Sequence, residues 1–226
     1  MATSDNVLLA RERLLQIAAE TFVESGFKAT SIRKICERAN VNVAMVHYYF
    51  RSKEDLYLAV LDFARQQERA TAIDPAASGA EVEPRERLRL AIKGLVFNLL
   101  NPGQSSLRTR LLAWELMDPS PAIGTIADRD IKPEHRYFAD MIRRITGDAL
   151  DDDAIQRCVF SIIGQAVFYA NARRIHEIAT PEITYDAAGI DMIAEHVYLF
   201  SMAALDGFAG HHDHTGPVQI NQDPSQ

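Results

Sequence analysis

The chain has 226 residues, of which 47% are hydrophobic, and this composition indicates a globular protein with a substantial core. No uninterrupted apolar run approaches the roughly 18 residues of a membrane-spanning helix, and the first residues lack the layout of a secretory signal. The net charge is −7, but residues 1–53 hold eight Lys and Arg against five Asp and Glu, while the remainder holds 16 against 26. A basic N-terminal segment on an acidic body is compatible with DNA binding, and we expect a cytoplasmic protein.

Helical periodicity dominates the chain and no segment alternates convincingly as a strand does, so we predict an all-α fold. The first predicted helix covers residues 7–25 and ends at Gly26, which can adopt the left-handed backbone of a helix stop. The apolar stripe of this helix consists of Leu15, Ala18, Ala19, Phe22 and Val23.

Two short helices follow, and together they predict a helix-turn-helix. Either Thr30 or Ser31 can cap the first of them, which ends near Asn40. Residues 40–42 are too few for anything but a tight turn, and the second helix then covers residues 43–50. Its residues expected to pack inward are Val43, Val46 and Phe50.

A longer helix beginning with the cap-like Ser52 runs to about Arg69 and is expected to connect the head to the rest of the chain. Beyond an extended linker, five further helices are predicted near residues 84–100, 104–117, 121–146, 151–177 and 186–209. The expected segments are a helix-turn-helix DNA-binding domain (1–53), a connecting helix and linker (54–83), a helical effector-binding and dimerisation domain (84–209), and a disordered tail (210–226).

The last two predicted helices are apolar on more than one side and therefore need more than one cover. A second copy of the chain is the economical second cover, and two helices from each chain would form a four-helix interface. The residues expected in this dimer interface are Ile162, Gly164, Ala166, Ile193, Val197, Phe200 and Ala204.

The outward residues of the helix at 43–50 are the candidates for reading DNA, because the second helix of a helix-turn-helix fits the major groove. His47 can bond to a base edge, Ala44 and Met45 can touch a thymine methyl, and hydroxyls, backbone N–H groups and charges around them can hold phosphates. The predicted DNA-binding residues are Thr30, Ser31, Arg33, Asn42, Val43, Ala44, Met45, His47, Tyr48, Tyr49 and Lys53. The competing interpretation is a short surface helix whose aromatic side chains pack on the body.

Residues 10–60 resemble the DNA-binding domain of TetR-family regulators, through Phe22, Gly26, the stretch from Thr30 to Asn42 and the stretch from Val46 to Leu56. The resemblance implies that the residues around the helix at 43–50 contact DNA, which is the surface that the preceding argument reached without it. Two positions depart from the family pattern, since Asn40 stands where a glycine is common and His47 where a tyrosine is common. Asn tolerates left-handed backbone, so the turn should survive, whereas His47 leaves the preferred base open.

The C-terminal part resembles the CecR branch of that family, through Leu112-Ala113-Trp114-Glu115, Asp118-Pro119-Ser120-Pro121 and the helix at 161–165. This resemblance implies a link to transport or drug-sensitivity genes. An effector pocket in a helical body should be mainly apolar with a few polar groups, although packing is the alternative role of every such residue. The candidates for effector binding are Phe97, Arg110, Trp114, Gln165, Phe168, Tyr169, Asn171 and His176.

The sequence gives no indication of catalysis, metal binding or disulfide formation. The sequence holds no nucleophile elbow, phosphate loop or zinc-protease helix, so we expect neither an enzyme nor a cofactor. His211, His212 and His214 have no fourth ligand at a structured spacing, so we expect no metal site. Cys36 and Cys158 lie far apart in apolar helical patterns, which favours buried reduced thiols.

The sequence thus favours a homodimeric repressor that a small-molecule effector releases from a palindromic operator. Two alternatives remain open. In the first, the protein binds DNA but serves a structural or protein-interaction role and senses no small molecule. In the second, it is a helical binding or enzymatic module that never meets DNA, and it would then show no salt-dependent DNA affinity.

Overall fold

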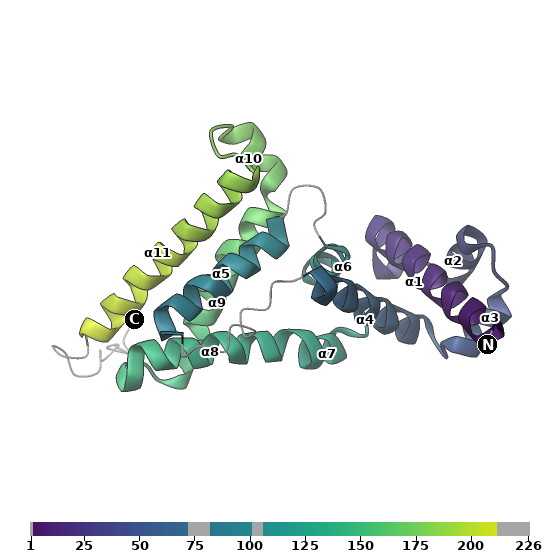
Figure 1. The fold of residues 1–226 in the computed structure, drawn as a ribbon, viewed down its shortest axis with the longest axis horizontal. Coiled ribbons are helices and arrows are strands. Elements are labelled where there is room, and N and C mark those ends of the chain that lie inside the picture. The colour runs from purple at the N-terminus through teal and green to yellow at the C-terminus, as the bar shows by residue number, and fades with distance from the viewer. Residues whose placement is uncertain (1, 72–81, 101–105, 212–226) are drawn as a thin grey trace, which may run out of the picture.

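A computed structural model describes residues 2–71, 82–100 and 106–211, and the elements in these ranges are all helices and turns. The predicted all-α fold is confirmed. Figure 1 shows an elongated molecule with the N-terminal helices at one end and a bundle of long helices at the other, joined through α4, α6 and α7. The predicted tail from His212 onward lies outside the described residues.

The N-terminal end of the molecule contains α1 (Ala2–Ala29), α2 (Ile32–Ala39), α3 (Val43–Tyr49) and α4 (Lys53–Thr71). The bounds of α2, α3 and α4 lie within two residues of the predicted helices, whereas α1 extends beyond the predicted 7–25 at both ends. Within α1, Gly26 has a φ of 71° and interrupts the regular helix, as expected of a glycine at a helix stop.

The remaining helices are α5 (Pro84–Leu100), α6 (Leu107–Met117), α7 (Ile123–Ile126), α8 (Lys132–Thr146), α9 (Asp152–Asn171), α10 (Arg173–Ala179) and α11 (Ala187–His211). The single helix predicted at 121–146 instead contains a π-helical turn at Ala127–Ile131. Pro133 follows this turn, and because proline lacks an N–H and crowds the carbonyl four residues earlier, it accounts for the widened turn.

The single helix predicted at 151–177 is wrong, because the chain bends at Ala172, between α9 and α10. After the bend, His176 on α10 lies 2.7 Å from the hydroxyl of Tyr185, measured from Nδ1. Its ring also lies against the rings of Phe168 and Tyr169. Contacts between residues on either side of the bend and of the following turn therefore fix the direction of α10, and helical periodicity could not reveal them.

Two separate hydrophobic cores hold the molecule together, and they divide it differently from the predicted domains. The first core, which we call the head core, joins α1–α4, yet it also includes Leu111 of α6, together with Ala122 and Ile126. The second, the body core, joins α5, α8, α9 and α11. The connecting helix α4 is thus part of the head, since Leu56, Tyr57, Val60, Leu61 and Ala64 are all buried in the head core.

A buried carboxylate fastens α4 to the π-helical turn. Asp130 has a side chain only 3% exposed, and it accepts hydrogen bonds from Arg65 of α4 at 2.7 Å and from Arg108 of α6 at 3.3 Å. A buried charge is tolerated only when it is paired in this way. Asp130 therefore holds three elements together where the head meets the body.

One described helix, α11, is long and apolar enough to cross a membrane by length and composition alone. Its residues Ile190, Ile193, Ala194 and Val197 are buried in the body core. A core helix of a globular protein has this same composition, and the packing of α11 against α5 accounts for it here (Figure 1).

Candidate nucleic-acid interface

The turn between α2 and α3 is fixed by three polar caps. Ser31 begins α2 and its hydroxyl accepts the N–H of Lys34 at 3.2 Å, while Asn42 begins α3 and its side-chain oxygen accepts the N–H of Ala44 at 2.8 Å. Asn40 ends α2 with left-handed φ and ψ of 53° and 48°, and its N–H reaches the carbonyls of Cys36 and Glu37. The turn therefore forms with Asn where relatives commonly have glycine.

The outer face of α3 is free to meet DNA. His47 and Tyr48 point to solvent, Tyr48 with 82% of its surface exposed, and Ala44 is exposed beside them. Only Val46 of this helix is fully buried, and Phe50, just after it, packs into the head core. An α3 anchored by Val46 and Phe50 presents Ala44, His47 and Tyr48 outward, where a helix in a major groove would meet base edges and phosphates.

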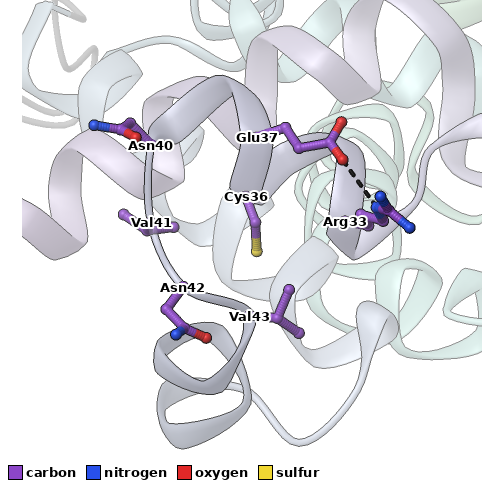
Figure 2. Close-up of a pocket in the computed structure, with 7 residues that line it drawn as sticks. All are labelled: Arg33, Cys36, Glu37, Asn40, Val41, Asn42 and Val43. Atoms are coloured by element: carbon purple, nitrogen blue, oxygen red, sulfur yellow. Dashed lines mark hydrogen bonds and ion pairs between the residues drawn. The ribbon is translucent and has the colours of Figure 1, made fainter.

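The inward role predicted for Val43 is wrong, because this side chain is 39% exposed at the start of α3. Tyr49 instead is half-buried and packs against the head core. Figure 2 shows Val43 at the rim of an open groove of about 640 Å³ between α2 and α3. This groove is lined by Arg33, Cys36, Glu37, Asn40, Val41, Asn42 and Val43.

Two residues predicted to hold phosphates are engaged within the protein. Thr30 is 2% exposed and its hydroxyl donates to the carbonyl of Gly26 at 2.7 Å, so it is not available to a phosphate. The ammonium of Lys53 donates to the carbonyls of Phe27 and Thr30, each at 3.0 Å, and lies over the ring of Phe27. Lys53 therefore ties the start of α4 to the end of α1.

Basic side chains surround this face. Arg33 is exposed on α2 and pairs with Glu37 at 2.9 Å, a contact across one helical turn that a phosphate can replace at small cost (Figure 2). The sequence interpretation missed Arg11, whose guanidinium lies 5.8 Å from the ring centre of Phe50, and Arg51, which is exposed directly after α3. Their contribution to the basic charge of residues 1–53 was the available signal.

Another arginine of the head, Arg38, is engaged in an ion pair with α1. Arg38 pairs with Glu24 of α1, and its guanidinium lowers the pKa of that carboxyl below its usual value through their hydrogen bonds. This pair joins α1 to α2. Arg38 is therefore less available to DNA than the exposed Arg33 and Arg51.

The predicted effector residues do not converge on one site. Phe168, Tyr169 and His176 lie together where α9 meets α10, but Phe168 is 63% exposed. Gln165 is not the buried amide expected, since its side chain donates to the carbonyl of Ser161 within the same helix, near the surface. Phe97 and Arg110 are exposed on α5 and α6, and Asn171 is exposed at the end of α9.

Trp114 has a different position from the one predicted. Its indole N–H donates to the carbonyl of Val23 in α1 at 2.9 Å, so it contacts the head. None of the residues predicted for effector binding lines the groove of Figure 2.

Four of the predicted dimer residues are buried within the chain itself, and their assignment is wrong. They are Ile162, Ala166, Ile193 and Val197, all part of the body core. Gly164, Phe200 and Ala204 are exposed as expected. The same two helices also expose large apolar side chains that the prediction omitted, namely Phe160, Phe168, Met192, Leu199 and Phe208.

The thiols differ in burial. Cys36 is fully buried and Cys158 is half-buried, and both are free. Burial raises the pKa of each thiol above its ordinary value. A neutral thiol is a poor nucleophile, so these residues have a structural role in packing.

Comparison with known proteins identifies both halves of the chain. The family model for bacterial regulatory proteins of the TetR family matches residues 14–60, and the model for the C-terminal domain of the HTH-type transcriptional dual regulator CecR matches residues 84–205. The dual regulator CecR of Shigella flexneri is 26% identical over 88% of this chain and 93% of its own. The repressor NicS of Pseudomonas putida is 38% identical over 62% of this chain and 58% of its own.

Solved structures agree on the fold. A TetR-like regulator from Rhodococcus sp. RHA1 superposes with a TM-score of 0.58 at 21% identity, over 88% of this chain and 96% of that one. AibR, solved with isovaleryl coenzyme A and operator DNA, superposes with a TM-score of 0.61 at 15% identity, over 83% and 95%. With both family models matched in their expected places, the chain belongs to the TetR family of DNA-binding transcriptional regulators and carries a C-terminal domain of the CecR type.

Proposed function

We propose that this protein is a cytoplasmic homodimeric repressor that binds a palindromic operator through α3 and is released by a small-molecule effector in its body. The observation that carries the proposal is the outer face of α3, where Ala44, His47 and Tyr48 are exposed on a helix anchored by Val46 and Phe50. Base-reading residues are Val43, Ala44, Met45 and His47, and phosphate contacts come from Ser31, Arg33, Asn42, Tyr48 and Tyr49.

The dimer forms through α9 and α11. Phe160, Gly164 and Phe168 recur every four residues on one face of α9, and Leu199 and Phe200 are more than half exposed on α11. Large apolar side chains at this spacing form a continuous apolar stripe, and two such stripes related by a twofold axis make an isologous interface. The operator then has two half-sites about one DNA turn, or ~34 Å, apart.

Two relatives support the regulatory part of the proposal. AibR was solved with both a coenzyme A thioester and operator DNA, and NicS is named a repressor. An effector that binds the body and the operator that binds the head must weaken each other equally, with a coupling of typically ~1–3 kcal/mol. The resemblance to CecR supports genes of transport or drug sensitivity as targets.

The experiment is selection of bound sequences from random duplex DNA, followed by titration of the selected site at two salt concentrations. We expect a palindrome with half-sites one turn apart and an affinity that falls steeply with salt. A library of small metabolites and drugs is then screened for compounds that raise the melting temperature and release the selected DNA. Absence of any enriched sequence contradicts DNA recognition, whereas stabilising compounds that leave operator affinity unchanged contradict effector-released repression.

A second candidate function is a DNA-bound factor whose body docks another protein. The observation that favours it is the apolar surface of α10, where Ile175 and Ile178 are 67% and 72% exposed. A docking partner would cover these residues without entering the body core. If Ile178→Lys leaves DNA binding and all effector responses intact and abolishes regulation in cells, this candidate is correct.

A further inference from the structure

The single tryptophan of the chain joins α6 to the end of α1, next to the helix-turn-helix. Trp114 lies on α6, and its indole N–H donates to the carbonyl of Val23 at 2.9 Å, a contact between residues 91 positions apart. Val23 lies in the last regular turn of α1, just before Gly26 interrupts that helix. Trp114 therefore adds a side-chain hydrogen bond to a backbone carbonyl close to the break in α1.

Gly26 permits the ring of Trp114 to approach. A Cβ atom on Gly26 would lie 3.0 Å from the ring, closer than an unshifted side chain tolerates, and the φ of 71° at this residue also disfavours any other amino acid. The carbonyl of Gly26 in turn accepts the hydroxyl of Thr30, the residue before the N-cap of α2. The ring of Trp114 thus lies directly against the backbone that leads into α2.

The segment after Trp114 holds the same part of α1 a second time. Asp118 forms an ion pair with Lys28, beyond the Gly26 break. The N–H of Asp118 donates to the carbonyl of Trp114 at 2.7 Å, and the segment that follows is held by Glu115, which is 5% exposed and accepts the N–H of Ser120 at 2.9 Å. Trp114 and Asp118 consequently contact α1 on both sides of Gly26, at Val23 and at Lys28.

Resting on the proposed function, we propose that Trp114 is a positioning residue for DNA recognition, which sets the orientation of α2 and α3 relative to α6 through a contact separate from α4. Helix α4 packs against α1 in the head core. The contact of Trp114 fixes the direction of the end of α1 relative to α6, and with it the direction of the chain that leads into the helix-turn-helix. In the dimer this orientation determines the half-site spacing that both recognition helices can reach together.

Trp114→Phe tests the proposal, because it keeps an aromatic ring and removes the N–H donor. Tyr185→Phe is the matched control, since it also keeps a ring and removes a hydrogen bond, that of the Tyr185 hydroxyl with His176, inside the body. Binding is measured to a panel of operators whose half-site spacing is lengthened or shortened by one and two base pairs. Melting temperatures of both variants are measured alongside.

We expect Trp114→Phe to bind the best operator about fivefold more weakly, as the loss of about one hydrogen bond implies, and to discriminate less between spacings. Tyr185→Phe should lose stability while keeping the spacing profile of the wild type. A merely structural role for Trp114 would give the two variants the same profile, and that result would overturn the proposal. If the wild type enriches no operator, the proposed function itself is contradicted.

The fluorescence of the wild type provides an independent test, because Trp114 is its only tryptophan. Binding of the selected operator should restrict the head to one orientation and protect Trp114 from quenching by acrylamide. Non-specific DNA of the same length, at the same occupancy, should protect it less. Equal quenching with and without operator would contradict the proposal even where the operator is bound tightly.

Discussion

The ammonium of Lys53, the first residue of α4, donates a hydrogen bond of 3.0 Å to the carbonyl of Thr30, the residue that precedes the N-cap of α2. A lysine at this position in the sequence suggests a simple phosphate contact, but here it also fastens two helices of the head. Its removal consequently has two effects, on stability and on DNA affinity, that the exposed residues of α3 do not share.

His47→Ala should therefore alter base preference alone, whereas Lys53→Met should alter both stability and overall DNA affinity. His47 is exposed, so its replacement should change base preference at one operator position by ~1–3 kcal/mol and leave the melting temperature unchanged. Lys53→Met should lower the melting temperature and weaken all DNA sequences alike. Quantitative binding to a set of single-base operator variants separates the two, and equal losses for both proteins at every base would refute this division of roles.

Asn40 should accept glycine but not a β-branched residue. Its left-handed backbone is costly for most side chains and free for glycine, so Asn40→Gly should change the free energy of unfolding little, while Asn40→Val should reduce it by roughly 1–2 kcal/mol. Urea unfolding followed by circular dichroism measures both. Comparable destabilisation by the two substitutions would show that the Asn side chain, rather than the backbone, is what the turn requires.

Asp130→Asn should be strongly destabilising. The substitution leaves Arg65 and Arg108 facing an uncharged amide in a site where the carboxylate is 3% exposed, and breaking such a buried pair costs roughly 3–5 kcal/mol. Asp140→Asn is the control, since Asp140 is exposed and pairs only with Arg143 across one turn. Denaturant midpoints that shift equally for the two variants would exclude a special role for the π-helical turn.

Leu199→Asp should convert the dimer to a monomer. Leu199 is 57% exposed on the apolar face of α11, and a pair of carboxylates facing each other across a twofold axis disfavours association. Sedimentation velocity and operator titration should show a folded monomer with much weaker operator binding. Met117→Asp is the control, since Met117 is an apolar side chain 81% exposed on α6, and it should leave the dimer intact. A Leu199→Asp protein that stays dimeric would place the interface elsewhere.

His135 should remain neutral when free histidine is half protonated. Burial lowers the pKa of its ring below 6.5, and the ring lies 4.9 Å from that of Phe160. Because the folded protein binds this proton less readily than the unfolded chain, His135 should reduce stability as the pH falls below 6.5. A ring titration by NMR with a midpoint at or above 6.5 would contradict the assignment, and His135→Gln should remove this part of the pH dependence.

Local features of the sequence were sufficient to place most helices. Gly26, Ser31 and Asn40 act on their own backbone, and their caps and stops depend on neighbours within a few residues. For the same reason the outer face of α3 could be named in advance, because a short helix with two anchoring residues leaves few alternatives. The exception was Thr30, whose bond to Gly26 competes with the capping role that Ser31 takes.

The roles of the apolar body residues could not be predicted in the same way. When a helix is apolar on most of its circumference, periodicity does not tell which stripe faces the chain's own core, and Ile162 and Val197 were assigned to the wrong side for that reason. Trp114 shows the same limit, since nothing near it in sequence indicates that its partner is the backbone of α1.

The head core is completed by Leu111, Ala122 and Ile126, residues that come after the linker and belong to the C-terminal half of the chain. A fragment ending before residue 84 would leave the apolar surface of α1 and α4 that these side chains cover open to water. Exchange of DNA specificity between relatives by joining one protein's N-terminal segment to another's body would therefore create a mismatched core. In such a chimaera α6 and the turn into α7 must come from the same protein as α1–α4. The part of this protein that must be exchanged to transfer DNA specificity is therefore discontinuous along the chain.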